Sequence, residues 1–497
     1  MTESPPEHAE HVMFNVLKSI AVDGGGARVG RLTLPKRKTI DTPNLFGLTS
    51  RGAIPHMTPD VIAKHTDLNG SYMALEDFVE KSQKRVVPAI YNIPESHGKD
   101  TLHAYTATPS PVATVLGARR HPAVIAPMGN GKDYISIYTS TGFQQLKNKE
   151  YYRAVERLQP DITILLADLT FGNSHIREKL PHPKRQLRMA ERTEDWLAEF
   201  IKLRAAENGD ETKKCGVFAP LLPVSYPMQW EYITRLSQDY VEHLSGLAVY
   251  DADILPDLIG HSSLNPLPRL SMDFITSPHE ILRQTRLGLD IFTVPFVNTT
   301  SDAGIALTFS FPPPAPSASG LHLLGMDMWS QDHQISLKPL VDGCECYACT
   351  KHHRAYLQHL LNAKEMLGWT LLQIHNHHVL DDFFKGIRAT LMAEPSAFER
   401  ECESFYKVYE SELPKGTGER PRARGYHFKT EGGQSKINPP AWEKWGEGGT
   451  EDPALAGEMA GLAVTGATAE GKETPVVPDP NADAKDLDKK GFAEIDR

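Results

Sequence analysis

The sequence predicts a closed (β/α)8 barrel, a TIM barrel, followed by a zinc-binding helical module. Two observations favour the barrel: short apolar runs alternate with amphipathic helical patterns from about residue 120, and no dinucleotide-binding fingerprint follows an early strand. A third observation indicates the module, because three of the five cysteines lie within six residues, from Cys344 to Cys349. We expect the barrel in residues 12–310 and the module in residues 321–410.

The composition predicts a soluble globular body with an acidic tail. The 497 residues are 40% hydrophobic and carry a net charge of −10. From Ala441 to Arg497 the chain has 13 acidic and six basic residues, a balance of −7, so only −3 remains for the rest. Such a segment buries too little apolar surface to fold, and we expect residues 431–497 to be disordered. Without a signal-like N-terminus or a membrane-length apolar run, we expect a cytoplasmic protein.

The elements expected before the module follow from hydrophobic periodicity. Residues 11–35 predict an N-terminal hairpin around a glycine-rich turn, which lacks the residues of a phosphate-binding loop. Helical patterns occur near residues 191–203, 232–244 and 281–287, and a proline-rich extended loop, Phe311–Gly320, closes the barrel region. The expected strands are residues 121–128, 134–139, 161–168, 215–221, 247–250, 270–275 and 289–294.

The cysteine pattern predicts the metal. Cys344, Cys346 and Cys349 offer three thiolates, and His375 offers an imidazole from the end of an apolar run. Three sulfurs and one nitrogen suit tetrahedral zinc, and four protein ligands leave no position for a catalytic water, so the zinc should be structural. Neighbouring histidines remain alternatives for the fourth ligand: His352, His353, His377 and His378.

Two helices are expected around this pattern. Apolar residues between positions 355 and 367 give a helical stripe that Gly368 should end, and a second helix should begin near His375. These helices either offer a face to a partner or pack on the barrel.

Candidate catalytic carboxylates are few. In a TIM barrel, function lies at the carboxyl ends of the strands, where Asp168, Asp251 and Asp253 are found. Asp168 also fits a helix or turn cap, and Asp251 and Asp253 also fit an exposed loop. No Ser-His-Asp arrangement or pair of convergent carboxylates is evident.

Several blocks of the sequence resemble the tRNA-guanine transglycosylase family. The longest runs from Val341 to Asn376, and others are GGGARVGRLTLP, STGFQ at Ser140–Gln144 and LGLDIFTVPFVNTTSDAGIALTF from Leu287. The resemblance implies a zinc-containing TIM barrel that exchanges the wobble guanine of GUN-anticodon tRNAs for a 7-deazaguanine. In eukaryotes that base is queuine, and the reaction passes through a covalent nucleotide intermediate.

The departures from the family pattern concern catalysis. Where catalytic members carry aspartates, this chain has Thr139 and Thr293. A threonine hydroxyl is a poor substitute for an ionised carboxylate. The resemblance therefore implies no catalytic residue here, and a subunit that pairs with a catalytic subunit in a eukaryotic heterodimer. The alternatives are a self-sufficient transglycosylase using Asp290 or Asp168, and a zinc-stabilised RNA-binding scaffold.

The resemblance also suggests where partners bind. The family dimerises through its zinc-side helices, so we expect partner contacts after Cys349. Association with the outer mitochondrial membrane is implied by the resemblance alone. Because phosphate contact needs positive charge on a reachable face, the candidate tRNA-binding residues are Arg177, Lys184, Arg185, Arg188, Lys351, His353 and Arg354.

Overall fold

The computed structural model divides the chain into two compact units, Met1–Glu431 and Gly432–Arg497. The first contains every element described below, and the expected acidic tail lies outside the described residues. The structure describes residues 13–20, 25–79, 87–94, 100–124, 129–139, 142–169, 181–206, 215–316, 320–418 and 421.

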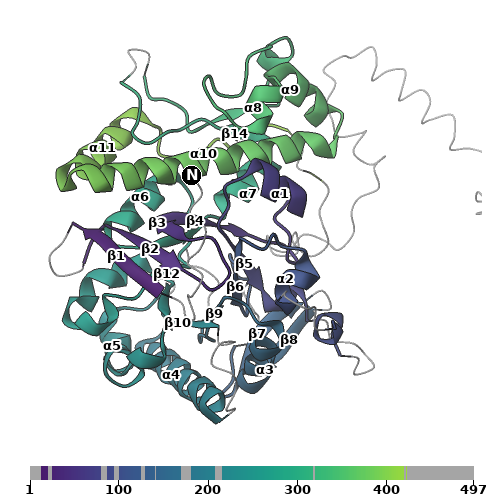
Figure 1. The fold of residues 1–497 in the computed structure, drawn as a ribbon. Coiled ribbons are helices and arrows are strands. Elements are labelled where there is room, and N and C mark those ends of the chain that lie inside the picture. Colours follow the sequence, from purple (N-terminus) through teal and green to yellow (C-terminus); the bar gives the residue numbers. More distant parts are fainter. Residues whose placement is uncertain are drawn as a thin grey trace, which may run out of the picture. The chain divides into compact units, whose positions relative to one another are not determined.

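The centre of the first unit is a closed barrel of parallel strands, which confirms the expected TIM-barrel fold (Figure 1). Strands that are neighbours in the barrel are also consecutive in the sequence, except that the β7–β8 hairpin is inserted between β6 and β9. The last strand, β13, pairs with the first, β4, and closes the barrel. The strands are β4 Asn44–Leu48, β5 Gly70–Ala74, β6 Ala113–Gly117, β9 Ile162–Ile164, β10 Gly216–Leu221, β11 Gly246–Val249, β12 Arg269–Ser271 and β13 Ile291–Thr293.

The start of the barrel differs from the expectation. Its first three strands precede residue 120, residues 121–124 have no regular structure, and Tyr134–Thr139 is β7 of a separate antiparallel hairpin with β8, Gly142–Lys147. The early strands were missed because each is only five residues long and contains glycine, which weakens the apolar signal. Gly70 is required by packing, since a Cβ there would lie 2.5 Å from the Phe46 ring.

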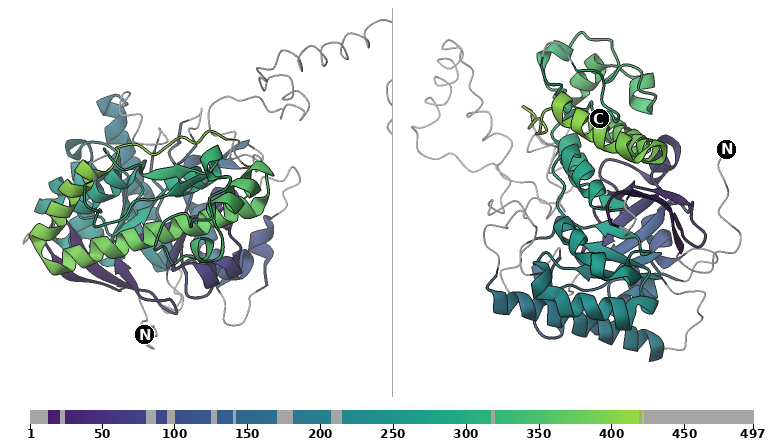
Figure 2. Two further views of the ribbon diagram at one scale, coloured as in Figure 1. Left: turned by 90° about the horizontal axis from the view of Figure 1, so that it is seen from above. Right: turned by 90° about the vertical axis from the view of Figure 1, so that its left-hand side faces the viewer.

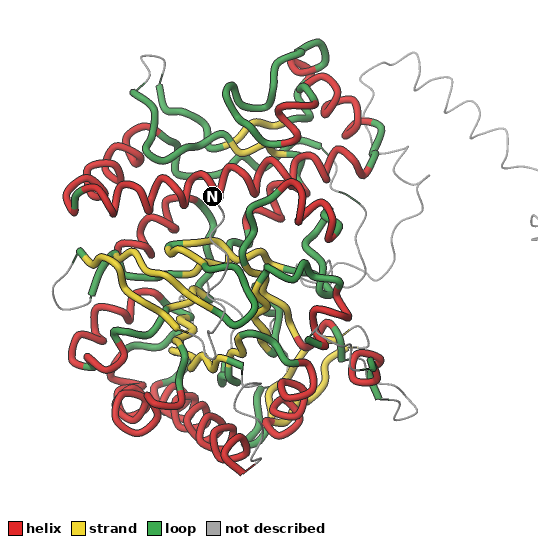
Figure 3. Tube along the Cα trace, in the orientation of Figure 1, coloured by secondary structure: helices red, strands yellow, loops and turns green. Residues whose placement is uncertain are grey.

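Helices surround the strands (Figure 3). The three helical patterns of the sequence correspond to α4, to α5 with a following π turn at Leu236–Tyr240, and to α6. The barrel-side helices are α1 Pro59–His65, α2 Thr101–Thr106, α3 Asn148–Leu158, α4 Pro183–Ala206, α5 Tyr226–Arg235, α6 Pro278–Arg286 and α7 Phe296–Asp302.

A three-stranded antiparallel sheet covers the amino end of the barrel. It consists of β1 Met13–Ser19, β2 Arg28–Thr33 and β3 Ile40–Thr42, so the expected hairpin is present with one further strand. Leu32 and Ile40 are fully buried in the same cluster as the barrel interior. The interior is therefore a packed apolar core rather than a channel.

A buried ion pair joins this sheet to the barrel. Arg28 donates from Nε to Asp290 Oδ1 at 2.9 Å and from Nη2 to Oδ2 at 2.5 Å, and both side chains are almost completely buried. The backbone N–H of Arg269 also donates to Asp290. Asp290 precedes β13, at the amino end of the barrel, where its charge holds the covering sheet in place.

The module follows the barrel and is organised around one long helix, α10 Met366–Ala393, which crosses above the barrel (Figures 1 and 2). Gly368 does not end a helix, because it lies in the first turn of α10 and packs against Leu360 and Leu361. The expected second helix therefore begins nine residues before His375. The other elements are β14 Ile305–Leu307, β15 Gly325–Asp327, α8 Tyr347–Lys351, α9 Arg354–Asn362 and α11 Pro395–Val408.

Among the described helices, none combines the length and the apolar character needed to cross a membrane.

The buried pair gives a test of what holds the sheet to the barrel. Arg28→Ala leaves the Asp290 carboxylate buried without its main partner, so we expect the free energy of unfolding to fall by about 3–5 kcal/mol. Arg31→Ala removes an exposed ion pair with Asp41 from the same sheet and should cost less than about 1 kcal/mol. Urea denaturation measures both, and equal losses would contradict the assignment.

Candidate functional site

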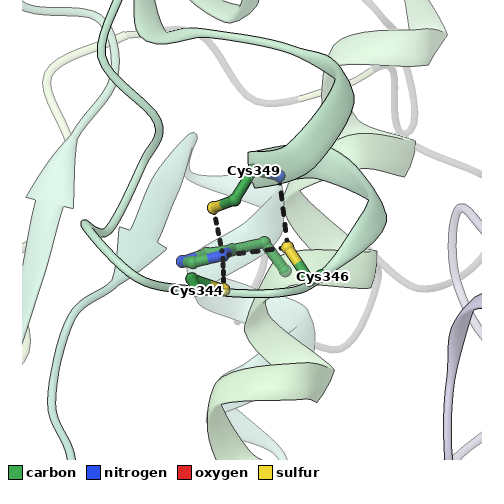
Figure 4. Close-up of side chains that lie close together, drawn as sticks. Cys344, Cys346 and Cys349 are labelled. Carbon is green, nitrogen blue, oxygen red and sulfur yellow. Dashed lines mark hydrogen bonds between the residues drawn. The ribbon is translucent and has the colours of Figure 1, made fainter.

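The three clustered cysteines and His375 converge on one point. The Nδ1 atom of His375 lies 3.7 Å from Cys344 Sγ, 3.5 Å from Cys346 Sγ and 3.4 Å from Cys349 Sγ. Figure 4 shows the three sulfurs around the imidazole ring. All four ligand atoms lie within 4.8 Å of one another, so the group can hold a metal ion.

These distances fit tetrahedral zinc. Zn–S bonds of about 2.3 Å and Zn–N bonds of about 2.0–2.1 Å, at tetrahedral angles, separate each sulfur from the nitrogen by about 3.6 Å. The observed separations lie on both sides of that value. The pKa of Cys344 is lowered because the thiols of Cys346 and Cys349 and the His375 ring hydrogen-bond to its thiolate, which is the form that binds metals.

The surrounding structure orients each ligand. His375 is completely buried, and its Nε2 atom donates to the Leu307 carbonyl at 2.9 Å, which leaves the Nδ1 lone pair directed at the sulfurs. Cys346 caps α8, because its sulfur accepts the backbone N–H of Cys349 at 3.3 Å. The cluster thus joins α8, the loop before it, α10 and β14.

The β7–β8 hairpin lies over the carboxyl end of the barrel, opposite the amino end that the three-stranded sheet covers. Glu76 follows β5 and is buried, and its two carboxylate oxygens accept the backbone N–H groups of Arg120 and Tyr138, each at 2.7 Å. Arg120 in turn donates to the Tyr138 carbonyl and to Asp77. These bonds fix the β7–β8 hairpin that carries Thr139, the residue matching one family aspartate.

Thr139 and Thr293, the two threonines that the sequence resemblance matches to aspartates of catalytic members, are buried and hydrogen-bonded. Thr293, at the end of β13, donates its hydroxyl to the Ser271 carbonyl at 2.7 Å. Thr139 donates to the Gly142 carbonyl at 3.0 Å and accepts from Gln144 at 2.8 Å. Neither hydroxyl therefore has the environment of an activated nucleophile.

Asp168 lies at the same end of the barrel, four residues after β9. It is completely buried and caps none of the helices in the described ranges, so the helix cap that its position also fitted is not found there. Its Oδ1 atom accepts from Asn130 at 2.7 Å and Arg185 at 2.9 Å, and its Oδ2 atom accepts from Arg192 at 3.2 Å. Both carboxylate oxygens of Asp168 therefore accept hydrogen bonds from side chains of the protein.

The remaining carboxylate candidates lie elsewhere or are occupied. Asp290 lies at the amino end of the barrel, away from the functional end of this fold, and is paired with Arg28. Asp251 caps the 3-10 helix Ala252–Gly260 by accepting from Asp253 N–H, and Asp253 pairs with Arg283. The exposed loop that the sequence allowed for Asp251 and Asp253 is thus the start of a 3-10 helix.

The candidate tRNA-binding residues fall into two groups. Lys184, Arg188 and Lys351 are exposed, while Arg177 lies outside the described residues. The other three have internal contacts: Arg185 with Asp168, His353 as the N-cap of α9, and Arg354 with the carbonyls of Pro339 and Leu340.

Comparison with known proteins places the fold and the cluster in a family. The sequence profile described as "Queuine tRNA-ribosyltransferase" matches residues 23–411, most of the chain. The chain belongs to the queuine tRNA-ribosyltransferase family. This agrees with the resemblance to tRNA-guanine transglycosylases in the sequence, and the match includes the barrel strands and the cysteine cluster.

Individual relatives within the queuine tRNA-ribosyltransferase family share one description. A Schizosaccharomyces pombe protein named queuine tRNA-ribosyltransferase accessory subunit 2 is 34% identical over 84% of this chain and 89% of its own length. Proteins of the same name from Drosophila grimshawi and Ixodes scapularis are 27% and 26% identical, over 76% and 73% of this chain and 88% and 91% of theirs.

Sequence reasoning missed the side chains that support this end of the barrel. Glu76, Asn130 and Arg192 support this end through contacts with residues 24 to 62 positions away, so no local spacing reveals them. A signal for Glu76 exists, because it lies two residues after the end of the short apolar strand β5, but that strand was itself missed.

The Thr293 contact can be tested. Thr293→Asp places a carboxylate, which accepts but does not donate when ionised, against the Ser271 carbonyl. We expect a loss of about 1–3 kcal/mol in the free energy of unfolding. Thr293→Ser keeps the donor and should be much less destabilising. Chemical denaturation of both variants decides, and equal stability of the two would show that the donor is unimportant.

Proposed function

We propose that this chain is the non-catalytic accessory subunit of a heterodimeric queuine tRNA-ribosyltransferase, which replaces guanine by queuine at the tRNA wobble position. The observation that carries the proposal is which residues occupy the two catalytic positions at the carboxyl end of the barrel. Thr139 and Thr293 stand where the family's catalytic members have aspartates, and both are buried and hydrogen-bonded. The accessory-subunit names of the relatives support the same conclusion.

The carboxylates available to a self-sufficient enzyme argue in the same direction. Asp168 is held by Arg185 and Arg192, and Asp290 is paired at the other end of the barrel. Using either in catalysis would require breaking buried charge pairs, which is costly. The chemistry of base exchange is therefore assigned to the partner subunit.

In this proposal Cys344, Cys346, Cys349 and His375 bind one structural zinc ion. The sulfur-to-nitrogen separations and the Leu307 contact to His375 support this set. When bound, zinc cross-links α8 to α10. The chain's own residues then hold the module in the shape that the partner recognises.

The partner contacts are proposed to lie on the module. Ile335 is 90% exposed and Leu337 is 75% exposed, in the loop before the cysteines, an unusual exposure for neighbouring apolar side chains. Close to the cysteines, ring contacts join His65 to Tyr347 at 4.3 Å, Tyr347 to His352 at 5.6 Å and His352 to Tyr356 at 5.5 Å. Aromatic side chains partly open to solvent are typical of interface centres.

The chain's contribution to tRNA binding is proposed to come from Lys184, Arg188 and Lys351, which are exposed, with Arg177 as a further candidate. Arg185 and Arg354 have structural contacts and contribute charge rather than free donors, and the Nδ1 atom of His353 is used to cap α9. We further propose that the heterodimer works in the cytoplasm and at the outer mitochondrial membrane, as the family resemblance implies.

Exchange activity tests the proposal directly. Labelled guanine or queuine incorporation into tRNA is measured for this chain alone, for the catalytic subunit alone and for the mixture. We expect turnover only in the mixture, because this chain lacks a free carboxylate at the required positions. Turnover by the isolated chain would overturn the proposal.

Matched variants extend the same assay to the interface. Ile335→Asp places a charge on the proposed partner face and should abolish both heterodimer formation and exchange. Ile259→Asp, at a 52% exposed position on the 3-10 helix after β11, is the control and should leave both unchanged. Equal effects of the two changes would place the interface elsewhere.

Metal analysis tests the ligand set. In Cys346→Ser the hydroxyl still caps α8 but is a poor zinc ligand, so we expect zinc content to fall and heterodimer formation to weaken. Cys215→Ser, at the start of β10, should retain zinc. Elemental analysis of the purified variants measures the metal, and unchanged zinc in Cys346→Ser would refute the assignment.

A further inference from the structure

The connection between β14 and β15 is unusually long. Two antiparallel strands are normally joined by two to five residues, but here 17 residues, 308–324, join Ile305–Leu307 to Gly325–Asp327. Connections of this length inside a compact unit are commonly functional. None of its described residues belongs to the metal cluster or to the carboxyl end of the barrel.

Both ends of this connection are fixed. Phe311 is buried, and its ring lies 5.6 Å from that of Phe383 and 6.0 Å from that of Phe398. At the other end, His322 N–H donates to the Val408 carbonyl at 2.8 Å. Thr308 bridges the two ends by donating its N–H to the Leu324 carbonyl at 3.1 Å and its hydroxyl to the Leu323 carbonyl at 3.0 Å.

Between these anchors the chain displays the segment Pro312–Pro316, with the sequence PPPAP. Pro312, Pro314, Ala315 and Pro316 are exposed, and Pro313 is partly exposed. Each proline ring fixes φ near −65°, and a residue that precedes proline is restricted to extended or polyproline II conformations. Four of the five residues also lack a backbone N–H. The segment is therefore preorganised as polyproline II and unsuited to joining a sheet.

The spacing of these residues matches a recognition pattern. Polyproline II has three residues per turn, so Pro313 and Pro316 lie on the same edge of the helix. Together with the residue before each, they form the two x-Pro dipeptides Pro312-Pro313 and Ala315-Pro316. Domains of the SH3 type bind such x-Pro-x-x-Pro segments in aromatic-lined grooves. We propose that Pro312–Pro316 is a docking segment for an SH3-type domain of a protein partner distinct from the catalytic subunit.

The flanking residues define the kind of groove that fits. Residues 308–324 contain no Asp, Glu, Lys or Arg, and Leu321 and Leu323, later in the same connection, are 56% and 55% exposed. The contact is therefore apolar, with backbone carbonyls as the hydrogen-bond acceptors. Its affinity should depend little on salt, unlike the binding of tRNA phosphates.

Binding to a panel of purified SH3 domains tests the proposal. The full chain is titrated against each domain, and the fluorescence of the tryptophan in the domain's groove reports binding. We expect saturable binding by at least one domain, with an affinity that is unchanged on raising the salt concentration. Pro313→Ala with Pro316→Ala should lower that affinity at least about tenfold.

Pro314→Ala is the matched control, because position 314 points away from the groove in this register. It should keep the affinity within about twofold, and thermal melts should match wild type for all three chains, since the changed residues lie outside the core. Failure of every domain to bind would overturn the proposal. So would binding that survives the double change, or an equal loss in Pro314→Ala.

Discussion

Helix α10 must satisfy two cores at once, and this constraint couples the module to the barrel. Its first turns place Trp369, Leu371 and Leu372 in the apolar cluster around the cysteines. Its second half places Phe383 and Phe384 among the helices that cover the barrel. Because the helix is continuous from Met366 to Ala393, any rotation that improved one contact would disturb the other. His375 lies between the two halves, so its direction is set from both sides.

The parts of the structure that were predictable from the sequence are those with local signals. Cys344, Cys346 and Cys349 lie close together in the chain, and the later strands are apolar runs between clear helices. The first strands depend on distant contacts instead: Gly70 suits a strand only because Phe46 lies against it. Gly368 gave a wrong prediction of a helix end for the same reason. It lies inside α10, where Leu361 packs too closely to leave much room for a larger side chain.

The barrel's carboxyl end has a rigid frame of buried hydrogen bonds. Glu76 holds the β7–β8 hairpin by two backbone N–H groups, and burial raises the pKa of this carboxyl group. Asp168 is likewise committed to Arg185 and Arg192. The carboxylates of Glu76 and Asp168 are thus used for hydrogen bonds and ion pairs within the protein. Such a use is compatible with a subunit that acts through its shape and its contacts.

The Leu307 contact to the metal cluster has a consequence for how such sites diverge. His375 donates to the carbonyl of Leu307, and the next residue, Asn376, accepts the N–H of Leu307 at 2.8 Å. Both bonds involve main-chain atoms of residue 307, so they persist with any side chain there that remains extended and fits. The residue type at position 307 therefore does not reveal this support of the histidine. Any apolar side chain that fits the buried site at position 307 leaves both main-chain hydrogen bonds in place.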